Sequence, residues 1–206
     1  MGKKSFIYEE IKFWNAKECP IPKRELTEEE VNMPVNFIKK NLIGCKKVLD
    51  FGPGKGRTFG AYGEIETVRA YDISDKWKSD VFDSVKRYKV KNFDLIISNK
   101  IENLPYEDNE FDTVVVSLVL LHQRPQYIIS IMSELVRVSK KVIAISYYSK
   151  LKDFILPGTI LDKSKAKKHN YNYKKICEDN KWFYKEMLHR LDFHNHLYFI
   201  FSGEEI

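Results

Sequence analysis

Three alternating glycines follow a short apolar run in a stretch that could bind a ligand. Gly52, Gly54 and Gly56 come directly after KVLDF, which contains one acidic residue, Asp50. Glycines lack a Cβ atom, so a loop built from them can take positive φ angles and approach a ligand closely. The N-terminus of a helix that follows such a loop is a favourable place for an anionic group. This stretch therefore predicts a strand, a nucleotide-like binding loop and a helix.

The spacing separates this loop from two other nucleotide-binding loops. A dinucleotide-binding turn needs a third glycine where Arg57 stands, and a P-loop needs Ser or Thr after its lysine, where Gly56 stands. The pattern present is Asp-x-Gly-x-Gly-x-Gly. A second acid, Asp72, ends the next predicted strand, where its carboxylate can accept hydrogen bonds from both hydroxyls of a ribose.

Short apolar runs alternate with segments of helix length along the first three quarters of the chain. Continuous apolar runs are typical of strands that are covered on both faces, as in parallel sheets. One intervening segment, 124–139, has the spacing of an amphipathic helix. The alternation predicts an α/β fold with right-handed crossovers. The predicted strands are 47–51, 67–73, 93–98, 111–121 (ending near Ser117) and 141–148.

The two ends of the chain carry further predicted elements. The segment 26–42 is predicted as a helix capped by Thr27, and Pro34 interrupts it as a candidate first residue of a second helix. Segment 149–172 has no period and is predicted as loop. A short helix at 173–180 and two strands follow. In the last strand, Tyr198, Ile200 and Ser202 alternate with Leu197, Phe199 and Phe201.

Several motifs in order resemble one enzyme family over about residues 46–148. VLDFGPGKGR resembles motif I of the class I S-adenosylmethionine-dependent methyltransferases, of the small methyltransferase type 11 kind. VRAYDIS, IENLPYEDNEFDTVVVSLVLLH and SELVRVSKKVIAIS resemble the later blocks of that family. The resemblance implies a Rossmann-like three-layer sandwich with a seven-stranded sheet of order 3-2-1-4-5-7-6, in which strand seven is antiparallel. It also implies a methyl-transferring enzyme with S-adenosylmethionine as cofactor and S-adenosylhomocysteine as product.

The resemblance also implies which residues contact the cofactor. These are Asp50, Gly52, Gly54, Gly56, Asp72, Ile73, Asn99, Lys100, Ile101, Ser117 and Leu118. One departure concerns the adenine, because family members commonly carry Asp after the third strand, where this chain has SNKIENLP. Lys100 cannot accept a hydrogen bond. Asn99 or Glu102 could replace that Asp, or Ile101 and backbone groups could hold the base.

The acceptor side is less defined. His122, after the fourth strand, is a candidate general base, with a structural role as the alternative. Aromatic residues are candidates for an acceptor pocket or a lid, with plain packing as the alternative. The pocket candidates are Tyr147 and Tyr148, and the lid candidates are Tyr8, Phe13 and Trp14. His194 and His196 are expected on the surface.

Absent motifs and composition limit the acceptor and partners. The chain lacks the Asp/Asn-Pro-Pro-aromatic signature of adenine-amine methylation and a Pro-Cys nucleophile for cytosine. The net charge of +6 comes from scattered lysines. We therefore expect a small-molecule acceptor methylated on oxygen or nitrogen. An RNA- or protein-modifying methyltransferase, using its basic surface, and a non-catalytic S-adenosylmethionine-binding protein remain alternatives.

The remaining expectations concern organisation and location. The chain is expected to be one domain over 1–206, with an N-terminal helical or lid segment (1–45), a cofactor-binding core (46–148) and an acceptor-side loop and hairpin (149–206). Three scattered cysteines without a CxxC pair suit a reducing cytoplasm and do not predict a metal site. No apolar run is long enough to predict a membrane span. The oligomeric state stays open.

Overall fold

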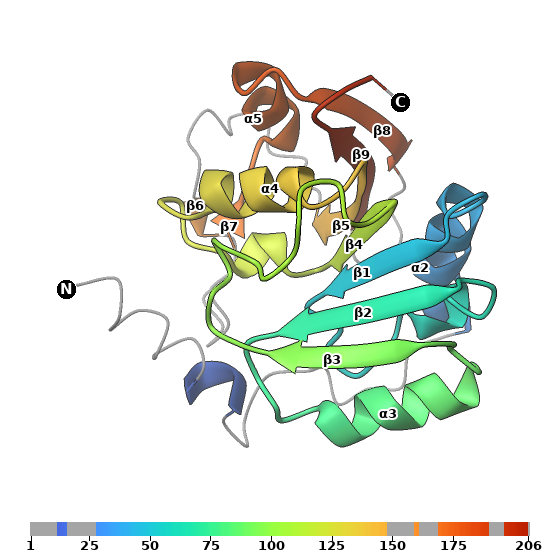
Figure 1. Cartoon of the computed structure of the whole chain (residues 1–206). Coiled ribbons are helices and arrows are strands. Elements are labelled where there is room, and N and C mark those ends of the chain that lie inside the picture. The colour runs from blue at the N-terminus through green and yellow to red at the C-terminus, as the bar shows by residue number, and fades with distance from the viewer. Residues whose placement is uncertain (1–11, 16–27, 148–158, 161–168, 190–195, 206) are drawn as a thin grey trace.

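A mixed seven-stranded sheet forms the centre of the molecule (Figure 1). The computed structural model describes residues 12–15, 28–147, 159–160, 169–189 and 196–205. The sheet order is β3-β2-β1-β4-β5-β9-β8. Its strands are β1 (Lys47–Phe51), β2 (Thr67–Asp72), β3 (Phe93–Ile97), β4 (Thr113–Ser117), β5 (Val142–Tyr147), β8 (Phe183–His189) and β9 (His196–Ser202).

Strands β1 to β5 are parallel, whereas β9 is antiparallel to both β5 and β8. This arrangement confirms the predicted order 3-2-1-4-5-7-6 and the antiparallel seventh strand. Because the first five strands are parallel, their carboxyl ends meet at one edge of the sheet. The residues that follow β1, β2, β3 and β4 are therefore brought together there, and this edge is where open α/β sheets bind their ligands.

Helices cover both faces of the sheet. They are α2 (Glu28–Asn41), α3 (Lys78–Arg87), α4 (Ile128–Arg137) and α5 (Tyr173–Asp179), with short 3-10 turns η1 (Phe59–Ala61) and η2 (Leu120–His122). One buried cluster joins α4 and α5 to the sheet, and a second joins α2, α3 and η1 to the opposite face. A separate two-stranded ladder pairs β6 (Thr159–Ile160) with β7 (His169–Asn170).

Strand β9 demonstrates the two-faced burial most clearly. Every residue from His196 to Ser202 is buried. Leu197, Phe199 and Phe201 belong to the α4–α5 cluster, whereas Tyr198 and Ile200 belong to the α2–α3 cluster. The predicted alternation in the last strand is confirmed, and both of its faces lie in the core.

Two local predictions are wrong. Pro34 lies inside α2, which runs unbroken from Glu28 to Asn41. Pro34 cannot donate a backbone hydrogen bond. However, Ile38 and Leu42 are buried against the sheet, and this packing outweighs the local preference.

The helix expected after the glycine loop is the second wrong prediction. In its place the chain forms turns and the three-residue η1. Two glycines weaken helix formation in this segment. They also permit close packing: a Cβ atom on Gly60 would lie 3.3 Å from Val35 Cγ1, and one on Gly63 would lie 3.4 Å from the carbonyl oxygen of Tyr88.

Candidate active site

The glycine loop after β1 uses its three glycines in two different ways. All three have positive φ, with values of +76°, +53° and +75° at Gly52, Gly54 and Gly56. A Cβ atom on Gly52 would lie 2.4 Å from Val119 Cγ2, and one on Gly56 would lie 2.7 Å from Ser84 Cβ. A Cβ atom on Gly54 would have no atom within 4 Å. Two glycines therefore allow close packing, and the middle one faces open space.

Asp50, the fourth residue of β1, is almost fully buried at 1% exposure. Its Oδ2 atom accepts hydrogen bonds from Thr58 Oγ1 at 2.6 Å and from the Tyr62 hydroxyl at 2.8 Å. Its Oδ1 atom is buried and has no hydrogen-bond partner. Burial raises the pKa of Asp50 to about 6, although the two hydroxyl donors oppose this shift. An unpartnered buried carboxylate oxygen is costly unless a ligand satisfies it.

Asp72 is the last residue of β2, the strand next to β1. Its Oδ1 atom accepts a hydrogen bond of 3.0 Å from the Ser74 backbone amide. Burial raises the pKa of Asp72, and the charge of Asp72 contributes to the raised pKa of Asp50. Because the charge of Asp72 raises the pKa of Asp50, a positively charged ligand beside the two acids would be favoured.

The end of β4 contributes a strained turn. Leu118 has a φ of +58°, which is uncommon for a residue other than glycine, and its amide donates a 2.8 Å hydrogen bond to the Ile145 carbonyl oxygen. Such conformations cost about 1–3 kcal/mol and occur often at functional sites. Before this turn, Ser117 Oγ lies 3.5 Å from Arg57 Nη2. The guanidinium of Arg57 therefore reaches from the glycine loop to the end of β4.

Comparisons with known proteins agree with this geometry. A family model described as methyltransferase domain matches residues 49–142. No curated protein matches the chain. Magnesium protoporphyrin IX methyltransferase (ChlM) from Synechocystis, solved with bound S-adenosylmethionine, is 16% identical, with a TM-score of 0.69 over 96% of this chain and 97% of that one. The PH0226 protein from Pyrococcus horikoshii is 15% identical, with a TM-score of 0.63 over 99% of this chain and 100% of that one.

The family match, the sheet order and the shared fold decide the identification. Residues 49–142 match the methyltransferase domain family, and the chain has the fold of the class I S-adenosylmethionine-dependent methyltransferases. Structures of the Synechocystis relative contain S-adenosylmethionine in one case and S-adenosylhomocysteine in the other.

The residues of the methyltransferase fit this cofactor. S-adenosylmethionine carries a sulfonium, an ammonium and a carboxylate group. The buried Oδ1 atom of Asp50 lacks a partner, and the space in front of Gly54 would be partly filled by any side chain there. A cationic group matches Asp50 and Asp72, whose ionised forms only accept hydrogen bonds.

The residues that follow β3 do not share the buried position that a common adenine site would need. Asn99 and Lys100 have exposed side chains, whereas Ile101 is 8% exposed and belongs to the α4–α5 cluster. Glu102 accepts a 2.6 Å hydrogen bond from Ser130 Oγ of α4. Glu102 therefore ties this loop to α4. Of the residues considered for adenine, Ile101 is the one that the fold holds in a buried position.

A helical turn at residues 12–15 lies against the ends of β2 and β4. The Trp14 ring contacts the His122 ring edge to face, with centroids 5.0 Å apart. Ser74 Oγ donates a hydrogen bond to Asn15 Oδ1. The turn therefore contacts residues that follow β2 and β4, where the predicted lid would lie. Tyr8, the other aromatic residue of that prediction, lies outside the described residues.

The C-terminal part of the methyltransferase also contacts the segments at the carboxyl ends of β4 and β5. Strand β7 contacts η2, and the Tyr171 hydroxyl donates a hydrogen bond to the Gln123 carbonyl oxygen. The hydroxyl groups of Ser146, in β5, and Tyr173 are hydrogen-bonded at 2.8 Å. These contacts hold the start of α5 beside the ends of β4 and β5.

The surface location expected for His196 is wrong. His196 is 7% exposed because it begins β9 in register with Tyr147 of β5, inside the sheet. The side chain of Tyr147, and the whole of Tyr148 and His194, lie outside what the structure describes.

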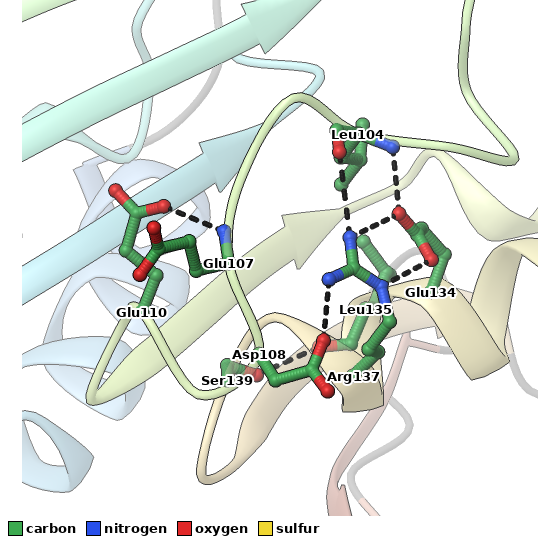
Figure 2. A network of polar contacts seen from close by, with 8 residues as sticks. All are labelled: Leu104, Glu107, Asp108, Glu110, Glu134, Leu135, Arg137 and Ser139. Atoms are coloured by element: carbon green, nitrogen blue, oxygen red, sulfur yellow. Dashed lines mark hydrogen bonds and ion pairs between the residues drawn. The ribbon is translucent and has the colours of Figure 1, made fainter.

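The block LPYEDNEFD is fixed to α4 by a polar network (Figure 2). Arg137 donates two hydrogen bonds of 2.6 and 2.8 Å to the carboxylate of Glu134, and a third, of 2.6 Å, to Asp108. The Leu104 amide donates a 2.6 Å hydrogen bond to Glu134, which is 8% exposed. The network orients the β3–β4 connection, which also carries Ile101. The block therefore has a structural role in this methyltransferase.

Sequence reasoning missed several residues around the predicted ones. Thr58 and Tyr62 lie one turn apart and both bind Asp50, a pairing that an i, i+4 spacing of hydroxyl residues after an acid could have suggested. Trp77 lies under two cations, with Lys55 Nζ 4.3 Å and Lys76 Nζ 4.7 Å from its ring centroid. No local pattern indicates that contact, because Lys55 and Trp77 come from different loops.

The described residues contain neither a candidate metal site nor a candidate membrane span. They contain no group of three or more His, Cys, Asp or Glu side chains that could hold a metal ion. Among the described helices, none combines the length and apolarity needed to span a bilayer.

Proposed function

We propose that this methyltransferase transfers a methyl group from S-adenosylmethionine to an oxygen or nitrogen atom of a small-molecule acceptor by in-line displacement. The observation that carries the proposal is the arrangement at the edge of the sheet where the carboxyl ends of the parallel strands meet. Asp50 is buried, Asp72 is half-buried, and both lie beside Gly54, where an added Cβ atom would have no other atom within 4 Å. A half-buried histidine, His122, follows the neighbouring strand β4.

The cofactor contacts follow from the chemistry of these groups. The unpartnered Oδ1 atom of Asp50 would accept a hydrogen bond from the methionyl ammonium. The Asp72 carboxylate would accept hydrogen bonds from the ribose hydroxyls, since an ionised carboxylate offers about four acceptor positions. Ile73, Ile101, Ser117 and Leu118 would surround the adenine and the methionyl chain, with Gly52 and Gly56 shaping the loop. Asn99 and Lys100, both exposed, would contribute backbone contacts or contacts at the rim.

His122 is proposed as the group that accepts the proton of the acceptor. The cofactor supplies a methyl group on a sulfonium sulfur, which leaves as a neutral thioether. Most of the rate enhancement would come from holding the acceptor in line with that methyl group. His122 supports such a role by its position in η2, where the edge contact with Trp14 restricts its ring. A purely structural role of His122 would leave kcat nearly unchanged in His122→Gln.

A division of the chain follows as part of the proposal. Residues 46–148 would bind the cofactor, and residues 1–45 and 149–206 would enclose the acceptor within one domain of 206 residues. Support comes from the turn at 12–15 and from β7, which both contact η2. The Synechocystis relative, named for a porphyrin substrate, matches over 97% of its own length and so has a similar extent.

A second candidate is methylation of RNA. Lys55, which lies in the glycine loop between Gly54 and Gly56, and Lys76 both contact Trp77, so basic and aromatic groups meet near the proposed cofactor site. Such groups bind phosphates and bases in nucleic-acid-binding proteins. A protein acceptor, or S-adenosylmethionine binding without turnover, is supported by no comparable feature of the described residues.

The two free cysteines described, Cys45 and Cys177, support a reducing compartment such as the cytoplasm.

The distribution of a radioactive methyl group tests the acceptor. The protein would be incubated with methyl-labelled S-adenosylmethionine and a whole-cell extract, and the products separated into small molecules, RNA and protein. Label in the small-molecule fraction, absent with His122→Gln, supports the proposal. Label that is sensitive to ribonuclease, and lost steeply with rising salt, would favour the RNA candidate instead. Label in none of the fractions, from a protein that binds the cofactor, would contradict catalysis.

A further inference from the structure

The loop after β1 lacks the helix that usually faces an anionic group. An anion site at a helix N-terminus depends on several free amide groups and on the summed peptide dipoles of the helix. In this methyltransferase the loop leads into turns and the three-residue η1, which ends at Ala61. The methionyl carboxylate of the cofactor therefore needs another cationic or donor group.

Arg57 has the position to supply that group. It follows Gly56 directly, where a dinucleotide-binding turn would have its third glycine, and its side chain is half-buried. Its Nη2 atom lies 3.5 Å from Ser117 Oγ at the carboxyl end of β4. Its charge also lowers the pKa of Asp50, opposing the effect of burial. The guanidinium is thus near both the first acid and the neighbouring strand end.

The charges at this edge match the two ends of an amino acid. Asp50 has a buried oxygen without a partner, which suits an ammonium group. Arg57 presents a planar fork of donors, which suits a carboxylate. We propose that Arg57 binds the methionyl carboxylate of the cofactor and replaces the missing helix N-terminus. This inference rests on the S-adenosylmethionine site that the proposed function uses.

A pair of ligands that differ by one carboxylate tests the inference. Isothermal titration would compare S-adenosylhomocysteine with its decarboxylated analogue, on the wild-type protein, on Arg57→Gln and on Arg57→Lys. A lost charge-assisted contact should weaken binding about ten- to a hundredfold. We expect Arg57→Gln to weaken S-adenosylhomocysteine binding by that factor and to leave binding of the analogue unchanged. Arg57→Lys should retain part of the affinity, because a point charge lacks the bidentate geometry.

Lys55→Gln provides the matched control. It removes a neighbouring loop cation whose side chain is exposed and lies over Trp77, so both ligands should bind it as they bind the wild type. Thermal unfolding of each variant would establish that the loop still folds.

The outcomes separate this inference from the proposed function. If Arg57→Gln lost the same affinity for both ligands, Arg57 would support the loop or Asp50 and not the carboxylate, and the inference would be overturned. Wild-type protein that binds both ligands equally would overturn it as well, while leaving the cofactor site intact. Failure of the wild type to bind S-adenosylhomocysteine at all would overturn the cofactor site and the inference together.

Discussion

The proposed donor side and the proposed acceptor side of this methyltransferase are built in different ways. The donor side consists of residues that directly follow β1 and β2, two neighbouring parallel strands: Asp50, the glycines and Asp72. The acceptor side combines the turn at 12–15, η2 after β4, and Tyr171 before α5. Short loops after parallel strands determine the first, whereas contacts between distant segments determine the second. Variants of each side should therefore fail differently.

Substitution of the loop glycines should have the largest effect on stability. Gly52→Ala introduces a Cβ atom 2.4 Å from Val119 Cγ2 at a positive φ, so it should lower the free energy of unfolding by roughly 2–5 kcal/mol. Gly54→Ala meets open space and should cost only about 1–2 kcal/mol of backbone strain. Urea unfolding would measure both.

The glycine comparison has an internal control. Val119→Ala, added to Gly52→Ala, removes the clashing methyl groups and should recover part of the lost stability, but not the part due to φ. Gly54→Ala should instead weaken S-adenosylhomocysteine binding more than its small loss of stability would suggest. Equal stability of Gly52→Ala and Gly54→Ala would contradict the distinction between a packing glycine and a ligand-facing one.

Asp50→Asn should separate stability from binding. The folded-state pKa of Asp50 is about 6, above the ordinary value of 3.8, so the fold favours the protonated form. Its contribution to stability is present below about pH 4 and is lost as pH rises through about 6, a change of about 3 kcal/mol. Asp50→Asn should therefore be more stable than the wild type at pH 8 in the absence of ligand, by chemical denaturation.

Binding should depend on pH in the opposite sense. In the proposed site the ionised carboxylate of Asp50 would accept a hydrogen bond from the ammonium group, so wild-type affinity for S-adenosylhomocysteine should rise as pH increases through about 6. Asp50→Asn should bind more weakly at neutral pH and lose most of this dependence. If Asp50→Asn were less stable than the wild type at pH 8, the assignment of Asp50 as a buried carboxylate that binds the ligand would be contradicted.

Asp72→Ala tests the second donor-side acid. Loss of hydrogen bonds to the ribose hydroxyls should weaken S-adenosylhomocysteine binding about ten- to a hundredfold, by isothermal titration. Exposed Glu66→Ala, at the opposite end of β2, serves as a control that should change nothing. Unchanged affinity in Asp72→Ala would rule out the proposed ribose contact.

Trp14→Ala should have the smallest effect on cofactor binding. Its ring contacts His122 on the acceptor side, so the variant should bind S-adenosylhomocysteine almost as the wild type does. The rate with the acceptor found by methyl labelling should nevertheless fall, because the His122 ring loses its neighbour. A loss of cofactor affinity as large as that of Asp72→Ala would assign residues 12–15 to the donor side instead.

Sequence patterns predicted the strands and the glycine loop of the proposed donor side because each of these parts is local. Buried runs such as KVLDF predicted the parallel strands, and the family resemblance supplied the sheet order that places Asp50 and Asp72 on neighbouring strands. Prediction failed where packing outweighed local preference. Pro34 is accommodated inside α2. Where a helix was predicted after the glycine loop, Gly60 and Gly63 pack closely against Val35 and Tyr88 in turns. His196 is buried because it pairs with β5, which no neighbouring residue reveals.

The sequence alone determined the positions of the strands, the glycine loop and the two acids of the proposed donor site, since these depend on residue type and short spacing, and the strand order came from the family resemblance. Only the tertiary structure decided what surrounds them. It brought Thr58 and Tyr62 onto one oxygen of Asp50, carried Arg57 to the end of β4, and set Trp14 against His122. Such contacts join side chains across loops and sheet edges, and their geometry follows from packing that no single segment encodes.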